Sequence, residues 1–171
     1  DISLQDLRKT HDTILIATGV YQAKDLKCPG VGATGVLPAL EYLTASNRKS
    51  FGDAVPEFDD GTLDAEGKRV VVIGGGDTAG SQREVANAEE EGVVFEWLAS
   101  PEAILDTKAG KVKAVRAAKM KLGEPDASGR QSPVKTGETM DVKADLVIKA
   151  LGFDAEDLPT LFGASELGVT R

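Results

Sequence analysis

The residues best suited to chemistry in this sequence are glycines that directly follow a β-branched run. Val70 to Ile73 is typical of a strand buried on both faces, and Gly74, Gly76 and Ala79 then form the pattern Gly-x-Gly-x-x-Ala. Glycine adopts positive φ and lets the backbone approach a pyrophosphate, whose charge the N–H groups of a helix start can bind. The pattern indicates a dinucleotide-binding βαβ unit, although a tight strand-to-loop turn uses the same residues.

Glu96 is a second candidate, because it follows the glycines by about 20 residues. An acidic residue at the end of the second strand of such a unit binds the ribose hydroxyls of NAD. Glu96, however, lies inside the apolar run Val93 to Leu98 instead of at its carboxyl end. The helix expected before it, from the capping box at Ser81 to Gly92, is rich in glutamate and offers a sheet few apolar residues. The sequence therefore disfavours Glu96 as a ribose ligand.

The elements expected around these residues follow from hydrophobic periodicity and from glycine and proline positions. Expected helices cover residues 3–10, 36–46, with Thr34 as cap and Pro38 in the first turn, 81–91 and 154–162. Expected strands cover residues 13–19, 69–73, 93–98, 111–122, 138–142 and 145–150, with a hairpin turn in residues 123–133. Residues 24–34 and 47–68 are expected to be a connector and a polar surface excursion.

Composition excludes several classes of function. The 171 residues are 41% hydrophobic, with a net charge of −8 and a pI near 4.7, so nucleic acid and anionic membranes are not expected as partners. Cys28 is the single cysteine, which excludes an internal disulfide and a cysteine metal cluster and indicates a reducing, cytoplasmic setting. His11, the single histidine, has polar neighbours and is expected at the surface. The start at Asp1 is neither a signal sequence nor a methionine, so we expect a part of a longer protein.

One internal similarity connects two distant segments. Asp12 to Gly19 and Asp145 to Gly152 each contain an aspartate, an apolar run and a turn of the form Ala-x-Gly.

These segments carry a family resemblance that covers essentially the whole chain. The sequence resembles the central part of the small (beta) subunit of NADPH-dependent glutamate synthase, in the superfamily of FAD/NAD(P)-dependent pyridine nucleotide-disulphide oxidoreductase-like proteins. Related FAD/NADPH modules occur in dihydropyrimidine dehydrogenase and in transhydrogenase-type enzymes. The residues that carry the resemblance are His11 to Tyr21, Ala39 to Leu43, Gly67 to Ala79, Arg83 to Phe95 and Asp145 to Phe153.

The resemblance implies an α/β fold, a Rossmann-like dinucleotide-binding three-layer domain with an added β-hairpin. It implies that residues 1–30 are the edge of an FAD-binding domain and a connector, that residues 31–149 are the NADPH-binding domain, and that residues 150–171 return toward the FAD-binding domain. In the family, a first helix and a second strand follow the glycine motif, and arginines at the end of that strand hold the 2′-phosphate. This sequence has no such helix–strand portion between Ala79 and Gly80.

The function implied is that of an oxidoreductase in glutamate biosynthesis. NADPH would pass a hydride to FAD, and iron–sulfur clusters would carry electrons to the glutamate synthase large subunit; the main FAD and iron–sulfur segments lie outside this sequence. No side chain is expected to act as a catalyst or metal ligand, and this chain alone is expected to be inactive. Two alternatives stay open: a reductase of the same architecture with another partner, and a folded module that binds no nucleotide. The residues implied in cofactor binding are Gly74, Gly75, Gly76, Asp77, Thr78 and Ala79 at the pyrophosphate, and Ala150, Leu151, Gly152 and Phe153 near the nicotinamide–flavin junction.

Overall fold

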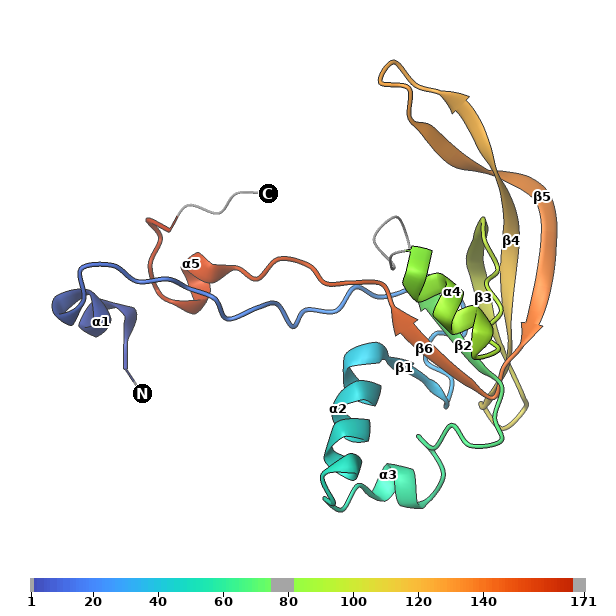
Figure 1. Ribbon diagram of the computed structural model, residues 1–171, viewed down its shortest axis with the longest axis horizontal. Helices are drawn as coiled ribbons and strands as arrows, with labels where there is room; N and C mark the ends of the chain where they lie inside the picture. Colours follow the sequence, from blue (N-terminus) through green and yellow to red (C-terminus); the bar gives the residue numbers. More distant parts are fainter. Residues whose placement is uncertain (1, 75–81, 168–171) are drawn as a thin grey trace. The chain divides into compact units, whose positions relative to one another are not determined.

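The computed structural model describes residues 2–74 and 82–167 and contains two compact units (Figure 1). The first unit combines the two ends of the chain, Asp1–Lys24 and Gly152–Arg171. The second unit is continuous from Asp25 to Leu151 and holds all the named strands. The sequence-based division at residues 30 and 150 into FAD-binding and NADPH-binding parts stays a prediction.

A parallel sheet forms the centre of the second unit. It contains β1 (Val36–Pro38), β2 (Val70–Gly74) and β6 (Leu146–Ala150) in the order β1-β6-β2. The side chains of Leu146 and Val147 on β6 are fully buried, one on each face of the sheet. A strand with helices or another sheet on both faces needs this kind of apolar run, and the strands expected near residues 69–73 and 145–150 are confirmed.

An antiparallel sheet forms the second layer. It contains β3 (Ala99–Asp106), β4 (Val112–Pro125) and β5 (Gln131–Lys143) in the order β3-β4-β5. The carboxylate of Asp126 accepts hydrogen bonds from the N–H groups of Ser128 and Arg130 and shapes the turn between β4 and β5. The expected hairpin is confirmed, and the basic side chains of β4 lie on its exposed positions.

Two apolar clusters hold these layers together. The first joins the parallel sheet to the antiparallel sheet through Ile73, Val147, Ile104 and Val115. The second lies on the other face of the parallel sheet, where Leu146 and Ile148 meet α2 (Ala39–Ser50) and α3 (Pro56–Asp59). The order of helix, parallel sheet and antiparallel sheet gives three layers, as the fold class predicted.

The helix expected over residues 36–46 begins three residues later than predicted. Val36 to Pro38 pair with β6 as β1, and α2 starts at Ala39 with Pro38 as its N-cap. Thr34 is not the cap, because it bridges Lys111 of the neighbouring layer. Val36 and Leu37 gain more from burial beside β6 than from a helical turn, and Pro38 has no N–H to donate within the helix.

The strand expected over residues 13–19 is wrong. No strand is assigned there, and the side chain of Leu15 is 88% exposed. In the described part of this unit, the β-pairing is a single bridge between Ala23 and Phe153. An apolar run becomes a strand only when a neighbouring backbone accepts its hydrogen bonds.

The strand expected over residues 93–98 is also wrong. The run is exposed at Val94, and its rings stack locally, with the centroids of Phe95 and Trp97 4.9 Å apart. Gly92 has φ +93° and Leu98 has φ +52°, so left-handed residues bracket the run and prevent a regular ladder. The strand β3 begins only at Ala99, and the preceding helix α4 (Gln82–Glu90) buries no residue.

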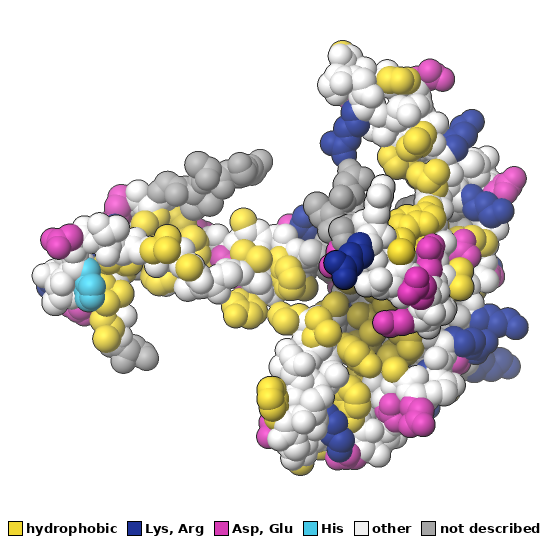
Figure 2. Space-filling view, in the orientation of Figure 1, with side chains coloured by type: hydrophobic (Ala, Val, Ile, Leu, Met, Phe, Trp, Pro, Cys, Tyr) yellow, Lys and Arg dark blue, Asp and Glu magenta, His cyan; other side chains and the backbone are white. Residues whose placement is uncertain are grey.

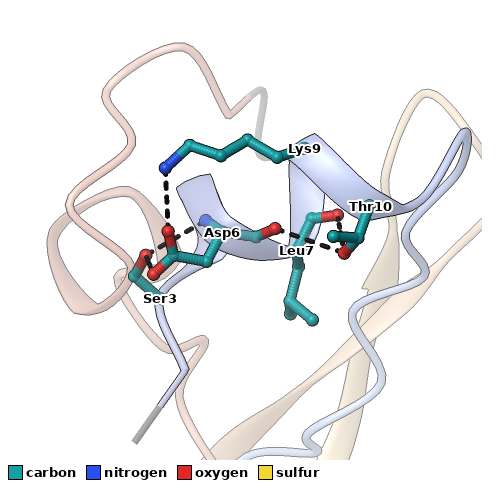
Figure 3. A network of polar contacts seen from close by, with 5 residues as sticks. All are labelled: Ser3, Asp6, Leu7, Lys9 and Thr10. Carbon is teal, nitrogen blue, oxygen red and sulfur yellow. Dashed lines mark hydrogen bonds and ion pairs between the residues drawn. The ribbon is translucent and has the colours of Figure 1, made fainter.

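The first unit carries the expected helix α1 (Leu4–Thr10), capped by Ser3 (Figure 3). The Asp6 N–H donates to Ser3 Oγ at 3.1 Å, and the Asp6 carboxylate accepts from Lys9 at 2.9 Å. Arg8 forms an ion pair with Glu166 near the other end of the chain. The closing helix α5 (Leu158–Leu161) is shorter than the one expected over residues 154–162.

Candidate nucleotide-binding site

The candidate site is the edge of the parallel sheet where β1, β6 and β2 end. Because the three strands are parallel, Pro38, Ala150 and Gly74 lie along the same edge. Ligands of α/β sheets bind outside the carboxyl ends of the strands. Helix α2 begins at this edge, directly after Pro38.

Position 74 requires glycine for a structural reason that does not depend on any ligand. Its φ is +150°, and a Cβ atom placed on it would lie 2.1 Å from the carbonyl oxygen of Ala150. The space beside Gly74 is therefore occupied by the backbone of β6. The remaining residues of the predicted pyrophosphate group, Gly75, Gly76, Asp77, Thr78 and Ala79, lie outside the described residues, and so does the junction of Ala79 and Gly80.

The second predicted group falls on both units. Ala150 pairs with Gly74, and the half-buried Leu151 packs on the core between the two sheets. Gly152 and Phe153 belong to the first unit, where the carbonyl of Gly152 accepts a hydrogen bond from the N–H of Lys24 at 3.0 Å. Within one unit, the structure thus brings together Gly74, Ala150 and Leu151.

Lys149 is a largely covered charged side chain at this edge that the sequence analysis did not single out. Its side chain is only 9% exposed, and its Nζ lies 2.6 Å from Oδ1 of Asp25. Two hydrogen bonds hold the pKa of Asp25 below its ordinary value. The larger effect comes from Lys149 and the smaller from the N–H of Leu26. The sequence does contain a signal for this residue, because Lys149 interrupts the otherwise apolar run Leu146–Ala150. Because Asp25 already neutralises Lys149, we do not assign Lys149 to a cofactor phosphate.

We expect Asp25→Asn to lower the free energy of unfolding by about 1–3 kcal/mol, because it leaves the largely covered Lys149 side chain without its hydrogen-bonded counter-charge. Adding Lys149→Met should restore most of this loss, since an apolar side chain needs no partner there. Urea unfolding followed by circular dichroism measures both effects. The matched control is Asp53→Asn in the exposed pair with Arg48, which should cost less than about 0.5 kcal/mol. Equal losses for the two aspartate variants would contradict this role for Lys149.

Arg69 and Asp145 form a second ion pair at the opposite, amino end of the sheet. The Asp145 carboxylate accepts hydrogen bonds from the backbone N–H of Arg69 at 3.0 Å and from its guanidinium at 2.8 Å. The guanidinium is the main reason why the pKa of Asp145 lies well below its ordinary range. This pair fixes the start of β2 beside the start of β6 and lies away from the candidate edge.

The described residues also bear on Glu96 as a ribose ligand, on metal binding and on membrane-spanning helices. Glu96 is exposed and lies in a segment without strand structure, so the geometry gives it no strand end from which to reach a ribose. In residues 2–74 and 82–167, no group of three or more histidine, cysteine, aspartate or glutamate side chains is arranged to hold a metal. Within the same residues, no helix has the length and apolar character needed to span a membrane.

The described edge fits the backbone part of a dinucleotide site. Two parallel strands end side by side at Gly74 and Ala150, as the fold requires for a bound pyrophosphate. Lys149 lies at this edge and is engaged with Asp25, so it is not assigned to a 2′-phosphate.

The layers and the parallel sheet define the class of protein as a Rossmann-like three-layer α/β domain. The solved structure "Mycobacterium tuberculosis FprA in complex with NADPH" superimposes with a TM-score of 0.62 at 19% identity, over 92% of this chain and 53% of that chain. This likeness establishes the fold. No family model matches the chain.

Sequence relatives specify the family further. The chain is 53% identical to the putative glutamate synthase [NADPH] small chain of Cereibacter sphaeroides and 49% identical to the glutamate synthase [NADPH] small chain of Azospirillum brasilense, in both cases over its whole length. The Escherichia coli K-12 small chain is 34% identical over 94% of this chain and 40% of its own length. The chain is thus a relative of the glutamate synthase [NADPH] small chain, and it spans 47% and 41% of the first two relatives.

The relatives carry additional residues within the matched region. The matches to the first two extend over 199 residues, which is 28 more than the 171 of this chain. The Escherichia coli match extends over 189 residues and 94% of this chain, again a surplus of about 28. A surplus that stays constant while identity falls from 53% to 34% favours one contiguous block over scattered short gaps.

Proposed function

We propose that this chain is the NADPH-binding part, with two short edges of the FAD-binding part, of a small subunit of NADPH-dependent glutamate synthase. The observation that supports this most strongly is the match of the whole chain to two such small chains at 53% and 49% identity. The parallel sheet with a glycine at the end of β2 agrees with a dinucleotide site.

Within this proposal, bound NADPH would supply the hydride, FAD would accept it, and iron–sulfur clusters would deliver electrons to the large subunit for glutamate formation. The chain itself positions the cofactor through the backbone at the ends of β2 and β6 and contributes no acid or base. A cytoplasmic location is part of the proposal and is supported by the single, free cysteine.

A second candidate is an NADPH-dependent reductase of the same architecture that serves another electron acceptor, as in dihydropyrimidine dehydrogenase-like or transhydrogenase-like proteins. This candidate stays open because more than half of the length of each of these two relatives lies outside the region that matches this chain. The position of the gene beside that of a glutamate synthase large subunit would distinguish the two.

A chimera tests the proposed function. In the Azospirillum brasilense small chain, the matching region is replaced by this chain, either with or without the surplus residues of that relative. With the surplus residues, we expect NADPH-dependent reduction of an artificial acceptor within about tenfold of the parent. Without them, we expect the Kd for NADPH to rise at least about 100-fold, equivalent to about 2.7 kcal/mol, because a first helix and its arginines would be missing.

Fluorescence titration of NADPH and NADH into both chimeras and into this chain alone provides the affinities. Tight NADPH binding by the 171-residue chain alone would contradict the expected loss. Inactivity of the chimera that keeps the surplus residues and folds as judged by circular dichroism would contradict the proposed function.

A further inference from the structure

An open depression lies at the end of the antiparallel sheet where β4 begins and β5 ends. Its volume is about 490 Å³. The residues that line it come from β3, β4 and β5 and from the position just before β2: Arg69, Leu105, Lys113, Ala114, Asp141 and Lys143. Because Arg69 lies at the amino end of β2, the depression is at the opposite end of that strand from the candidate nucleotide-binding edge.

Two of the charged side chains at the depression are already neutralised. The guanidinium of Arg69 donates two hydrogen bonds of 2.8 Å to Asp145. The guanidinium of Arg116 donates hydrogen bonds of 2.7 and 2.8 Å to Asp141. Each of these bidentate pairs fixes the orientation of both partners and leaves no net charge.

The lysines at this end of the sheet lack such partners. Lys113 and Lys143 at the depression, and Lys108 and Lys111 in the adjoining turn between β3 and β4, form no ion pair with any residue that the structure describes. One carboxylate, that of Asp106, lies at the end of β3 beside the same turn. Figure 2 shows Lys and Arg side chains gathered at this end of the antiparallel sheet.

This basic end contrasts with the rest of the chain, in which acidic residues are in excess. The sequence has 28 acidic residues against 20 lysines and arginines, which gives a net charge of −8. A net charge of one sign keeps a protein soluble, and unpaired lysines reduce that charge here. Solubility therefore does not explain the basic end, and the charges favour an acidic partner. The negative net charge disfavours nucleic acid in that role.

The floor of the depression is apolar. Ala114 is buried, and Leu105 is half-buried and still reaches the depression. A small molecule is normally enclosed over most of its surface, whereas this depression lies open to solvent. An open apolar floor with cations around it fits a segment of another protein better than a small ligand.

We propose that this basic depression, formed by Lys113, Lys143, Leu105 and Ala114, binds an acidic segment of a partner protein. Carboxylates of the segment lie against the two ammonium groups, and one apolar side chain covers the floor. Since the charges are exposed, the association depends strongly on ionic strength. The proposal does not rest on the proposed function, because the depression and the nucleotide-binding edge are at opposite ends of β2.

The experiment titrates the 171-residue chain into a fluorescently labelled peptide in which several glutamates surround one leucine. Fluorescence anisotropy should show saturable binding, which weakens at least about fivefold between about 0.05 and 0.3 M salt. At about 0.1 M salt, Lys113→Glu and Lys143→Glu should each weaken binding at least about tenfold, because attraction becomes repulsion. Lys113→Arg keeps the charge and should stay within about twofold of the unchanged chain.

The matched control is Lys121→Glu, which makes the same charge change on the same strand. Lys121 is exposed and lies about 26 Å from Lys113 along β4, at about 3.3 Å per residue. This separation exceeds the screening length of about 10 Å at 0.1 M salt, so the affinity should change less than about twofold. Circular dichroism checks that all variants keep the fold.

Several results would overturn the proposal. One is the absence of saturable binding, and another is equal affinity for a peptide with glutamine in place of glutamate. Equal weakening by Lys113→Glu and Lys121→Glu would show that net charge alone governs binding. Full competition by inorganic phosphate at matched ionic strength would show a site for small anions. A dimer of the chain alone that Lys113→Glu dissociates in sedimentation would show that a second copy occupies the depression.

Discussion

Gly74→Ala is expected to lower the free energy of unfolding by about 3 kcal/mol or more. The added Cβ would lie 2.1 Å from the carbonyl oxygen of Ala150, and φ at this position is +150°, where L-residues are strained. Backbone strain and overpacking each cost about 1–3 kcal/mol. The two clashing atoms, the added Cβ and the carbonyl oxygen of Ala150, are not at the end of a flexible side chain, so neither can turn away. The end of β2 must therefore move away from β6. Urea unfolding followed by circular dichroism gives the value.

Gly67→Ala is the matched control. Gly67 precedes the same strand and has φ +67°, but no heavy atom lies within 4 Å of the position that an added Cβ would occupy. Its substitution should cost about 1–2 kcal/mol, the cost of the left-handed conformation alone. If the two variants unfold at the same urea concentration, the close approach to Ala150 does not explain Gly74. The comparison separates the structural need for this glycine from any role in nucleotide binding.

Leu146→Ala is expected to destabilise the chain by about 3 kcal/mol. Leu146 is fully buried on the central strand, where it contacts the α2 side of the core. Removing its methyl groups loses transfer free energy and leaves a cavity between layers that cannot easily collapse. Chemical denaturation with intrinsic fluorescence from Trp97, the single tryptophan, gives the midpoint and the slope.

Val72→Ala on the neighbouring strand is the control for Leu146. The two positions lie on the same face of the sheet, but Val72 is 61% exposed, so its truncation should change the free energy of unfolding by less than about 0.5 kcal/mol. A cost of Val72→Ala close to that of Leu146→Ala would mean that the face of β2 is covered in solution.

Some elements could be predicted because their signals are local. Helix α1 has a serine cap and an apolar face, and the β4–β5 hairpin has turn residues between two extended runs. Strand β2 is β-branched from Val70 to Ile73, and strand β6 is apolar except at Lys149. For these elements, propensity, periodicity and end signals agree.

Other elements could not be predicted because a strand depends on its neighbours. The runs over residues 13–19 and 93–98 are as apolar as β6, yet neither has a strand beside it in the described structure. Residues 36–38 became a strand through pairing with β6, more than 100 positions away in the sequence. Hydrogen bonding across such separations leaves no mark in the local pattern.

The glycine motif and its family resemblance were readable from residue order, because glycine and β-branched residues act through local backbone preferences. The reason for Gly74, a carbonyl of β6 within reach of any Cβ, became visible only once the two strands were placed side by side. The same holds for Lys149, whose partner Asp25 lies 124 positions away, and for Val72, whose strand is apolar but exposed. Burial and charge pairing are properties of the assembled layers, so tertiary structure decided which apolar residues form the core and which stay at the surface.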